Sequence, residues 1–404
     1  MLNPTNANFY IFLGWCLILL LVNYLSFIFL PDIKTSGRNL ILLSTISIFV
    51  RFLIIAVFPF AVGYDVKAFL WAAEKIKNGQ DIYWSLNVRE YYAFLPTFGM
   101  ITALFLKLSR LDPVVFFKLS ASVFDSLIPL IIAKVSRNLK GGLLYALSPI
   151  SVISSISGQF DAIPLFFTMS SLYLANQNSL PFSALLLGIG VAFKPWPLIF
   201  TPLILFKAPN RREGEKLLVL ALTVPLAVSL FYKLLIPASN LATMVLAIIL
   251  YESSIGWWGP SVIFFHLAQI TYHRKILTVP AFFSKIFTLG ILFFIFSRFK
   301  NKNIFLTTQW LILALYLFSF GLSIHYFVWI LPLILINKTV LKKEFFLAVG
   351  LFTILNSAYI FNFHYQPPAL PLWLKDTSSV LLWIFMAYWA IRNFRFQKPL
   401  NRLL

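Results

Sequence analysis

Apolar stretches follow one another along almost the whole chain, and short polar segments separate them. A membrane-spanning helix needs about 20 predominantly apolar residues. The pattern therefore predicts an all-α polytopic membrane protein with about 11–14 transmembrane helices, some of them half-length. The predicted spans are 9–30, 40–62, 93–107, 114–133, 141–157, 161–176, 182–206, 217–236, 281–297, 304–322, 324–337, 344–361 and 377–391.

Two of the segments between the predicted spans are long, at 63–92 and 237–280. In the first, Val66–Lys77 has the spacing of an amphipathic helix. We expect Phe69, Leu70 and Ala73 to lie on the membrane, and the charged residues to face water, namely Lys67, Glu74, Lys75 and Lys77. The second holds two apolar pieces, around 241–250 and 260–270, which we interpret as interfacial or re-entrant.

Lysine and arginine in the short loops set the orientation. They are concentrated in 31–39, 107–110, 207–216, 298–302, 338–343 and the C-terminal tail, which we therefore place in the cytoplasm. The basic segment 134–140 falls outside in this arrangement and argues against it locally. Both long segments then lie outside. We expect the function to reside where these two outer loops meet the helix bundle.

Composition agrees with a single membrane domain over residues 1–404. The chain is 60% hydrophobic and 11% charged, against roughly 25% charged in an average soluble domain. Its net charge of +20 comes from basic residues between apolar stretches, which favours contact with anionic lipid headgroups over nucleic acid. Cys16 is the single cysteine, so a disulfide framework or thiolate metal site is excluded.

Asp65 follows a predicted span directly and precedes the amphipathic segment. A carboxylate at the outer membrane boundary is placed to act as a general base on a hydroxyl. The alternative is that Asp65 caps the helix that begins at Val66. Spacing alone favours the cap.

Arg51 and Lys194 are among the charged residues inside predicted spans, where charges are costly. Lys194 is followed by Pro195, which breaks a helix and leaves backbone groups that need partners. Lys194 could therefore mark a polar site or a structural break. Arg51 lies midway through 40–62, where it could be functional or could extend its charged end to the membrane interface.

Two short polar segments offer further side chains. In SGQFD (157–161), Gln159 and Asp161 could bind a polar ligand, or Asp161 could simply cap the next helix. In SIHYFVWILP (323–332), His325 falls at the outer end of a span and could bind phosphate, although a lone histidine at a helix end is more often only a satisfied polar residue. The other histidines have no metal-ligand spacing.

Several of these fragments, taken in order, resemble the glycosyltransferase-C superfamily. The resemblance is closest to the polyprenyl-phosphate-mannose-dependent mannosyltransferases, namely family 87 and the first mannosyltransferase of GPI-anchor assembly. It covers roughly residues 55–335. The fragments are Tyr64–Asp65, FLWAA at 69–73, Gly79 with Tyr83, YYAFLP at 91–96, SGQFD at 157–161, AFKPWPL at 192–198 and SIHYFVWILP at 323–332.

The resemblance implies a conserved seven-helix module with one large outer loop after its first helix and another after its seventh. Here the module corresponds to 40–236, with outer loops 63–92 and 237–280. Residues 281–404 are then variable C-terminal helices, and 9–30 is an added helix. Where family 87 members often have Tyr–Pro–Pro, this chain has Ala93–Phe94–Leu95–Pro96, and YESSIGWWGP (251–260) has no clear counterpart.

The function that the resemblance implies is the inverting transfer of a hexose, expected to be mannose, from a polyprenyl-phosphate-linked donor at the extracytoplasmic face. The acceptor would be lipid-linked or protein-linked, as a glycolipid or glycan. The membrane would be the cell membrane, or the endoplasmic reticulum membrane in a eukaryote. No cofactor or metal is expected, because the chain has no Asp-x-Asp pair.

Residue roles follow from the same comparison. Asp65 is the expected catalytic base. His325, Lys194 and Arg51 are expected to bind the donor phosphate, and His325 to lie on the same side as Asp65, roughly 6–12 Å from it. Trp257 and Trp258 could stack on sugar faces, although interfacial anchoring is the commoner role of tryptophan at such places. The expected substrate-binding residues are Tyr64, Tyr92, Gln159, Asp161, Trp257, Trp258 and Tyr326.

A polytopic transporter or lipid-linked-oligosaccharide flippase without transferase activity is the alternative. Buried charges and broken helices also fit a transporter. Transporters usually have paired halves, however, and this sequence contains no internal repeat. The absence of symmetry therefore favours the enzyme.

Overall fold

The computed structural model describes residues 6–59, 62–63, 65–84, 92–249, 251, 255–271, 275–360 and 371–397. Their regular structure is helical, apart from isolated bridge residues such as Lys34 and Asn138, which pair with each other. The predicted all-α class is therefore confirmed.

Five described helices are long and apolar enough to cross a membrane. They are α1 (Asn6–Phe29), α2 (Gly37–Val57), α5 (Pro113–Ser136), α11 (Arg211–Leu235) and α14 (Lys275–Phe299). The pair α6 (Leu139–Ala146) and α7 (Pro149–Ile156), bent by 50°, makes a sixth if it counts as one span. The chain is thus a multi-span membrane protein.

Several other predicted spans correspond to shorter apolar helices, because proline or a polar turn interrupts them. The span predicted at 182–206, for example, is divided at Lys194–Pro195 into three pieces. Those pieces are α9 (Leu180–Phe193), the 3₁₀ turn η2 (Trp196–Phe200) and α10 (Thr201–Leu205).

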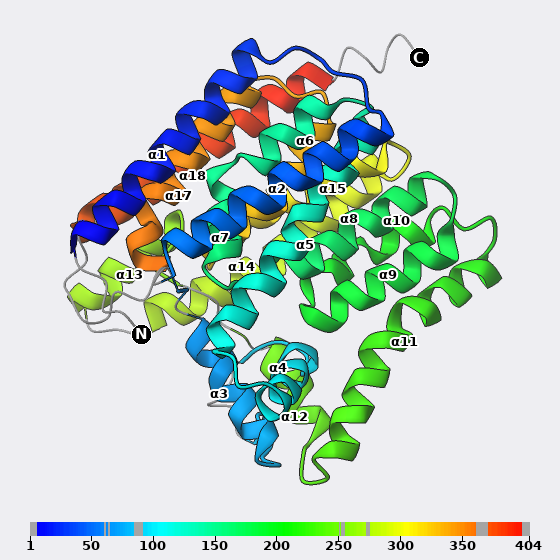
Figure 1. The fold of residues 1–404 in the computed structure, drawn as a ribbon. Coiled ribbons are helices and arrows are strands. Elements are labelled where there is room, and N and C mark those ends of the chain that lie inside the picture. Colours follow the sequence, from blue (N-terminus) through cyan, green and yellow to red (C-terminus); the bar gives the residue numbers. More distant parts are fainter. Residues whose placement is uncertain are drawn as a thin grey trace. The chain divides into compact units, whose positions relative to one another are not determined.

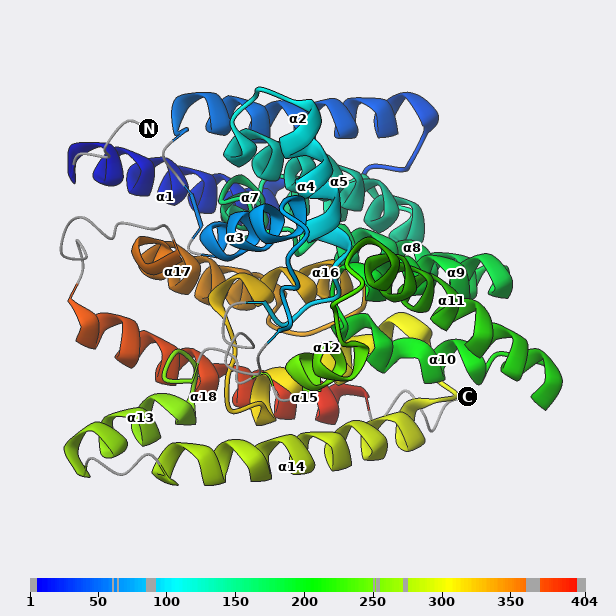
Figure 2. The same ribbon diagram turned by 90° about the horizontal axis from the view of Figure 1, so that it is seen from below.

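The chain divides into two compact units, whose boundaries fall within α5 and α7. Unit 1 consists of Met1–Ala61, Ile132–Ile153 and Glu252–Leu404. In it α1 packs along α17 (Lys342–Ile360), and α2 packs on α6 (Figure 1). Its remaining elements are α13 (Pro260–Thr271), α14, α15 (Ile304–Phe318), η3 (Ile324–Trp329), α16 (Leu331–Ile336) and α18 (Leu372–Gln397), and Figure 2 gives a second view of α13, α14 and α18.

Unit 2 consists of Val62–Ile131 and Ser154–Tyr251. In it α8 (Ala162–Asn176), α9 and α11 lie side by side (Figure 1). A Cβ on Gly188 of α9 would lie 2.5 Å from the carbonyl oxygen of Ala221 in α11. Ser171 and Ser183 each donate to the other's carbonyl oxygen at 2.8 Å across α8 and α9. Close approach at small residues and interhelical hydrogen bonds are how helices associate in lipid.

The predicted amphipathic helix is confirmed as α3 (Val66–Lys77). It packs on α4 (Thr97–Leu108), and its apolar face is covered by protein rather than lipid. The ring of Phe69 contacts four other aromatic rings, those of Phe94, Phe98, Phe117 and Phe160. The expectation that Phe69 and Ala73 lie on the membrane is therefore wrong, because both are buried in the aromatic core of unit 2.

The chain after α3 is fastened to α11 by Tyr232. Gly79, with φ of 71°, ends α3 in the left-handed conformation that glycine adopts readily. The Tyr232 hydroxyl then donates to Asp81 at 2.8 Å and accepts from the Ile82 amide at 2.9 Å. Asp81 and Ile82, which follow α3, thus have fixed positions within unit 2.

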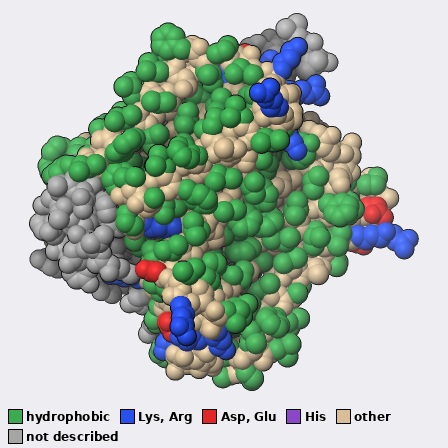
Figure 3. Space-filling view, viewed as in Figure 1, with side chains coloured by type: hydrophobic (Ala, Val, Ile, Leu, Met, Phe, Trp, Pro, Cys, Tyr) green, Lys and Arg blue, Asp and Glu red, His purple; other side chains and the backbone are tan. Residues whose placement is uncertain are grey.

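The surface of the described residues is strongly apolar. On the face in Figure 3, hydrophobic side chains predominate over α1 and α2, and charged ones gather in a few small groups. Phe282, Phe283 and Phe293 of α14 are also exposed. Apolar area on this scale is typical of a surface that contacts another apolar phase, which here is the lipid.

Candidate functional site

Asp65 is the residue before α3 and is only half-buried. Its backbone is already helical, with φ of −67° and ψ of −16°, and its side chain makes no capping hydrogen bond. A capping aspartate has an extended backbone and accepts from an amide two or three residues ahead. The cap hypothesis therefore does not explain Asp65.

The turn that contains Asp65 is attached to the SGQFD segment. The Gly63 amide donates to the Ser157 carbonyl at 2.7 Å. Gly158 has φ of 80°, and a Cβ on it would lie 3.0 Å from Val66 and 3.2 Å from Phe117. The segment therefore reaches the start of α3 only because a glycine stands at this position.

Asp161 forms a buried ion pair with Lys194. Its oxygen Oδ2 lies 2.8 Å from Lys194 Nζ, and the two side chains are 0% and 2% exposed. Asp161 precedes α8 but makes no capping hydrogen bond. Lys194 is extended, with φ of −141° and ψ of 140°, as expected for a residue before proline. The pair thus joins SGQFD to the lysine–proline break.

Aromatic rings cover this ion pair. Lys194 Nζ lies 4.7 Å from the ring centroids of both Phe94 and Phe160, which is cation–π distance. Phe94 belongs to the YYAFLP fragment, and its carbonyl accepts from the Tyr83 hydroxyl. Burial raises the pKa of the Tyr83 phenol, so it stays protonated and can donate. Four of the fragments noted in the sequence therefore meet in unit 2.

Two of the expected substrate-binding residues, Tyr92 and Gln159, differ in their hydrogen bonding. Tyr92 is buried, and its hydroxyl donates to the Leu95 carbonyl and accepts from the Gly99 amide. It fixes the turn before α4. Gln159 is buried too, but its Oε1 has no hydrogen-bond partner among the described residues. Its Nε2 would lie 3.0 Å from a Cβ on Gly63, so Gln159 is beside the Asp65 turn. Tyr64 lies outside the described residues.

Arg51 is fully buried in unit 1 and bonds to its own chain. It donates to Ser47, to the Ala146 carbonyl at 3.2 Å and to Ser151 Oγ at 3.1 Å. Ala146 ends α6 and Ser151 lies in α7. Arg51 therefore satisfies polar groups where these helices bend, and the sequence-based idea that it extends to the interface is wrong because it is enclosed.

His325 and Tyr326 lie in η3 of unit 1, and both are buried. The Ser323 hydroxyl is 3.0 Å from His325 Nδ1, which orients the imidazole. The Tyr326 ring stacks on Trp329 with centroids 4.3 Å apart. The distance expected between His325 and Asp65 stays a prediction.

The two tryptophans of YESSIGWWGP have different environments. Trp258 is buried, its Nε1 donates to the Tyr316 carbonyl at 2.6 Å, and its ring packs on Phe327 and Phe352. It cannot stack on a sugar without leaving this core. Trp257 is half-buried, with Lys375 Nζ 4.5 Å from its ring centroid. Only Trp257 is therefore placed to meet a ligand.

Sequence reasoning missed a polar cluster around Trp257 that includes His266, Lys375 and Asp376. His266 and Asp376 are 110 positions apart, so no motif or periodicity in the sequence relates them. The sequence signal that could have indicated the cluster was the pair of opposite charges Lys375–Asp376 near the start of the apolar helix α18. Among the described residues, no group of three His, Cys, Asp or Glu side chains could hold a metal ion.

The buried ion pair predicts a specific pattern of stability. Lys194→Met should lower the free energy of unfolding by about 3–5 kcal/mol, because Asp161 is then a buried charge without its partner. The double variant Asp161→Asn/Lys194→Met should recover most of this loss, since no charge is left. Denaturant titration of the purified protein in mixed micelles measures both.

Lys216→Met is the matched control. Lys216 pairs with Glu213 at 2.7 Å, but the two side chains are 56% and 40% exposed. Its loss should change the free energy of unfolding by less than about 1 kcal/mol. Wild-type stability of the Lys194→Met variant would contradict the structural role of the Asp161–Lys194 pair.

No protein-family model matches the chain. The chain is similar to the curated protein GPI mannosyltransferase 1 of Kluyveromyces lactis, with 27% identity over 180 residues. The matched region is 40% of this chain and 42% of that protein, so the chain spans about two fifths of the length of the relative. This multi-span membrane protein is therefore a distant relative of a GPI mannosyltransferase.

Proposed function

We propose that the protein is an integral membrane glycosyltransferase that transfers mannose from a polyprenyl-phosphate-linked donor to a glycolipid or glycan acceptor. Transfer takes place at the extracytoplasmic face of the membrane, where the sequence places Asp65. The distant similarity to GPI mannosyltransferase 1 supports the class of reaction.

The observation that carries the proposal is the setting of Asp65. Its carboxylate is not used to cap α3, although it stands at the N-terminus of that helix. The turn before it is hydrogen-bonded to SGQFD, and that segment is held in turn by the buried Asp161–Lys194 pair. A carboxylate whose position depends on a buried ion pair, and which does not cap its own helix, is typical of a functional group.

The chemistry follows from this carboxylate. Asp65 accepts the proton of the acceptor hydroxyl, and the hydroxyl oxygen attacks the anomeric carbon of the donor sugar. The bond between that carbon and the phosphate oxygen breaks, and the polyprenyl phosphate leaves with the electron pair. A single displacement of this kind inverts the configuration. General-base assistance contributes typically about 10²–10⁴-fold to such a step.

The neighbouring residues take supporting roles in this proposal. Gln159 offers an uncommitted acceptor beside the Asp65 turn, suited to a sugar hydroxyl. Lys194 and Asp161 position the turn rather than bind phosphate, because each already neutralises the other. Arg51 is structural for the reasons given above. His325 remains our proposed ligand of the donor phosphate.

Replacement of Asp65 tests the base directly. Asp65→Asn should leave the protein folded in the membrane but lower the transfer rate at least about 100-fold, because an amide cannot accept the proton. The measurement is single-turnover transfer of radiolabelled mannose from polyprenyl phosphate mannose in proteoliposomes.

Asp112→Asn is the control for this variant. Asp112 accepts from the Val114 amide at 2.8 Å and so caps the start of α5. Asparagine preserves a cap, so this variant should transfer mannose at the wild-type rate. Near wild-type turnover of Asp65→Asn would remove Asp65 as the base.

Chelation tests the expected absence of a metal. Transfer should persist in excess EDTA, because a lipid-linked phosphate leaving group can be held by side chains and the sequence has no Asp-x-Asp pair for a divalent ion. Loss of transfer in EDTA that Mn²⁺ or Mg²⁺ restores would contradict this prediction.

A further inference from the structure

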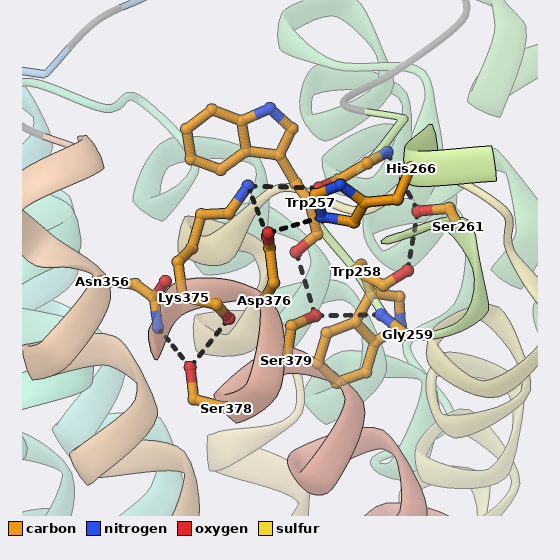
Figure 4. A network of polar contacts seen from close by, with 11 residues as sticks. Trp257, Trp258, Gly259, Ser261, His266, Asn356, Lys375, Asp376, Ser378 and Ser379 are labelled. Atoms are coloured by element: carbon orange, nitrogen blue, oxygen red, sulfur yellow. Dashed lines mark hydrogen bonds and ion pairs between the residues drawn. The ribbon is translucent and has the colours of Figure 1, made fainter. Parts of the chain in front are cut away.

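A polar network lies in unit 1 where α13, α17 and the start of α18 meet the segment 255–259 (Figure 4). Asp376 is at its centre. Its Oδ2 is 2.7 Å from His266 Nε2, and its Oδ1 is 3.0 Å from Lys375 Nζ. Figure 4 shows the ammonium and carboxylate groups near both the Trp257 indole and the His266 imidazole.

The segment that carries Trp257 is rigidly held. Gly256 and Gly259 have φ of 84° and 52°, and a Cβ on either would lie 2.7 Å from the ring of Phe265 or Trp383. Ser261 bonds both the Gly256 amide and the Trp258 carbonyl. Ser379 does the same for the Gly259 amide and the Trp257 carbonyl. The backbone on both sides of Trp257 therefore has a preset position.

A buried ion pair such as the one in this network adds little net stability. The Lys375 and Asp376 side chains are 7% and 12% exposed, and burying such a pair costs about as much as it returns. In other proteins, apolar residues of similar volume often stabilise the fold as well as such a pair does. Charges retained in a membrane protein at this cost indicate a functional site by default.

The remaining hydrogen-bonding capacity indicates the class of ligand. The Lys375 ammonium donates to the Gly256 carbonyl, forms an ion pair with Asp376 Oδ1 at 3.0 Å and lies 4.5 Å from the centroid of the Trp257 ring. An anion would therefore find no uncommitted cation. A carboxylate only accepts, so His266 Nε2 is the donor, and in the neutral tautomer that this bond selects Nδ1 would be an acceptor. The His266 side chain is 44% exposed, so Nδ1 can accept from a hydroxyl.

A sugar combines the two features that this surface can receive. Its hydroxyl groups donate hydrogen bonds, and one face of a pyranose ring presents polarised C–H groups that suit the negative face of an indole. We propose that Trp257 and His266, braced by Asp376 and Lys375, form a saccharide-binding subsite for the acceptor. Its assignment to the acceptor rests on the proposed function, whereas its preference for a sugar rests on the network alone.

Saturation-transfer NMR on the full-length protein in phosphatidylcholine nanodiscs tests this subsite. The probes are methyl α-mannopyranoside, methyl α-glucosaminide and myo-inositol, with acyclic sorbitol as the comparison. At least one cyclic probe should bind and sorbitol should not. Trp257→Ala and His266→Ala should each weaken that affinity roughly tenfold, and Trp257→Phe should weaken it less.

Trp373→Ala is the matched control, because Trp373 lies on the same helix α18 but is 65% exposed. It should bind the probe as the wild type does. Tryptophan fluorescence melts establish that each variant is folded. Failure of every cyclic probe to bind, or binding that survives both the Trp257 and His266 substitutions, overturns the subsite.

Transfer of mannose by the same wild-type sample separates this inference from the proposed function. Transfer without subsite-dependent binding of sugars rejects the subsite alone. Subsite-dependent binding by a protein that transfers from no polyprenyl-phosphate donor rejects the transferase and leaves the saccharide site standing.

Discussion

The buried ion pair between Asp161 and Lys194 is the interaction on which the candidate site depends. It joins the turn before α8 to the break after α9, two places where the chain departs from helix. Removing either charge leaves the other in an apolar surrounding, which is far more costly than never having the pair. The Asp65 turn is attached to the Asp161 segment through the Gly63–Ser157 hydrogen bond, so the position of the proposed base follows from the same pair.

Much of the architecture could be predicted because lipid imposes a simple pattern. Apolar length identified α1, α2, α5, α11 and α14, and amphipathic spacing gave α3 with its exact bounds. Hydropathy could not tell a face that meets lipid from one that meets protein, since both are apolar. For this reason Phe69 was expected on the membrane, yet it is buried. The same ambiguity hid the difference between Trp257 and Trp258.

Contacts between distant residues could not be predicted from spacing. Asp161 and Lys194 were both noted in the sequence, but their pairing depends on how α8 and α9 pack. Arg51 appeared as an isolated charge, because the carbonyl and hydroxyl groups that bind it belong to the bend between α6 and α7. These cases show three uses of polar groups in an apolar interior. Asp161 and Lys194 link two helix breaks, and Arg51 donates to backbone and hydroxyl groups at a helix bend. As we propose for Asp65 and the Trp257 cluster, such groups can also bind a substrate.

The choice of donor tests the central claim most directly. Purified protein in proteoliposomes would receive either polyprenyl phosphate mannose or a nucleotide-linked mannose, each radiolabelled, together with a membrane glycolipid extract as acceptor. The account predicts that label moves to a glycolipid from the polyprenyl phosphate donor alone. Transfer from the nucleotide sugar, or net movement of the labelled polyprenyl donor across the bilayer without any transfer, would contradict it.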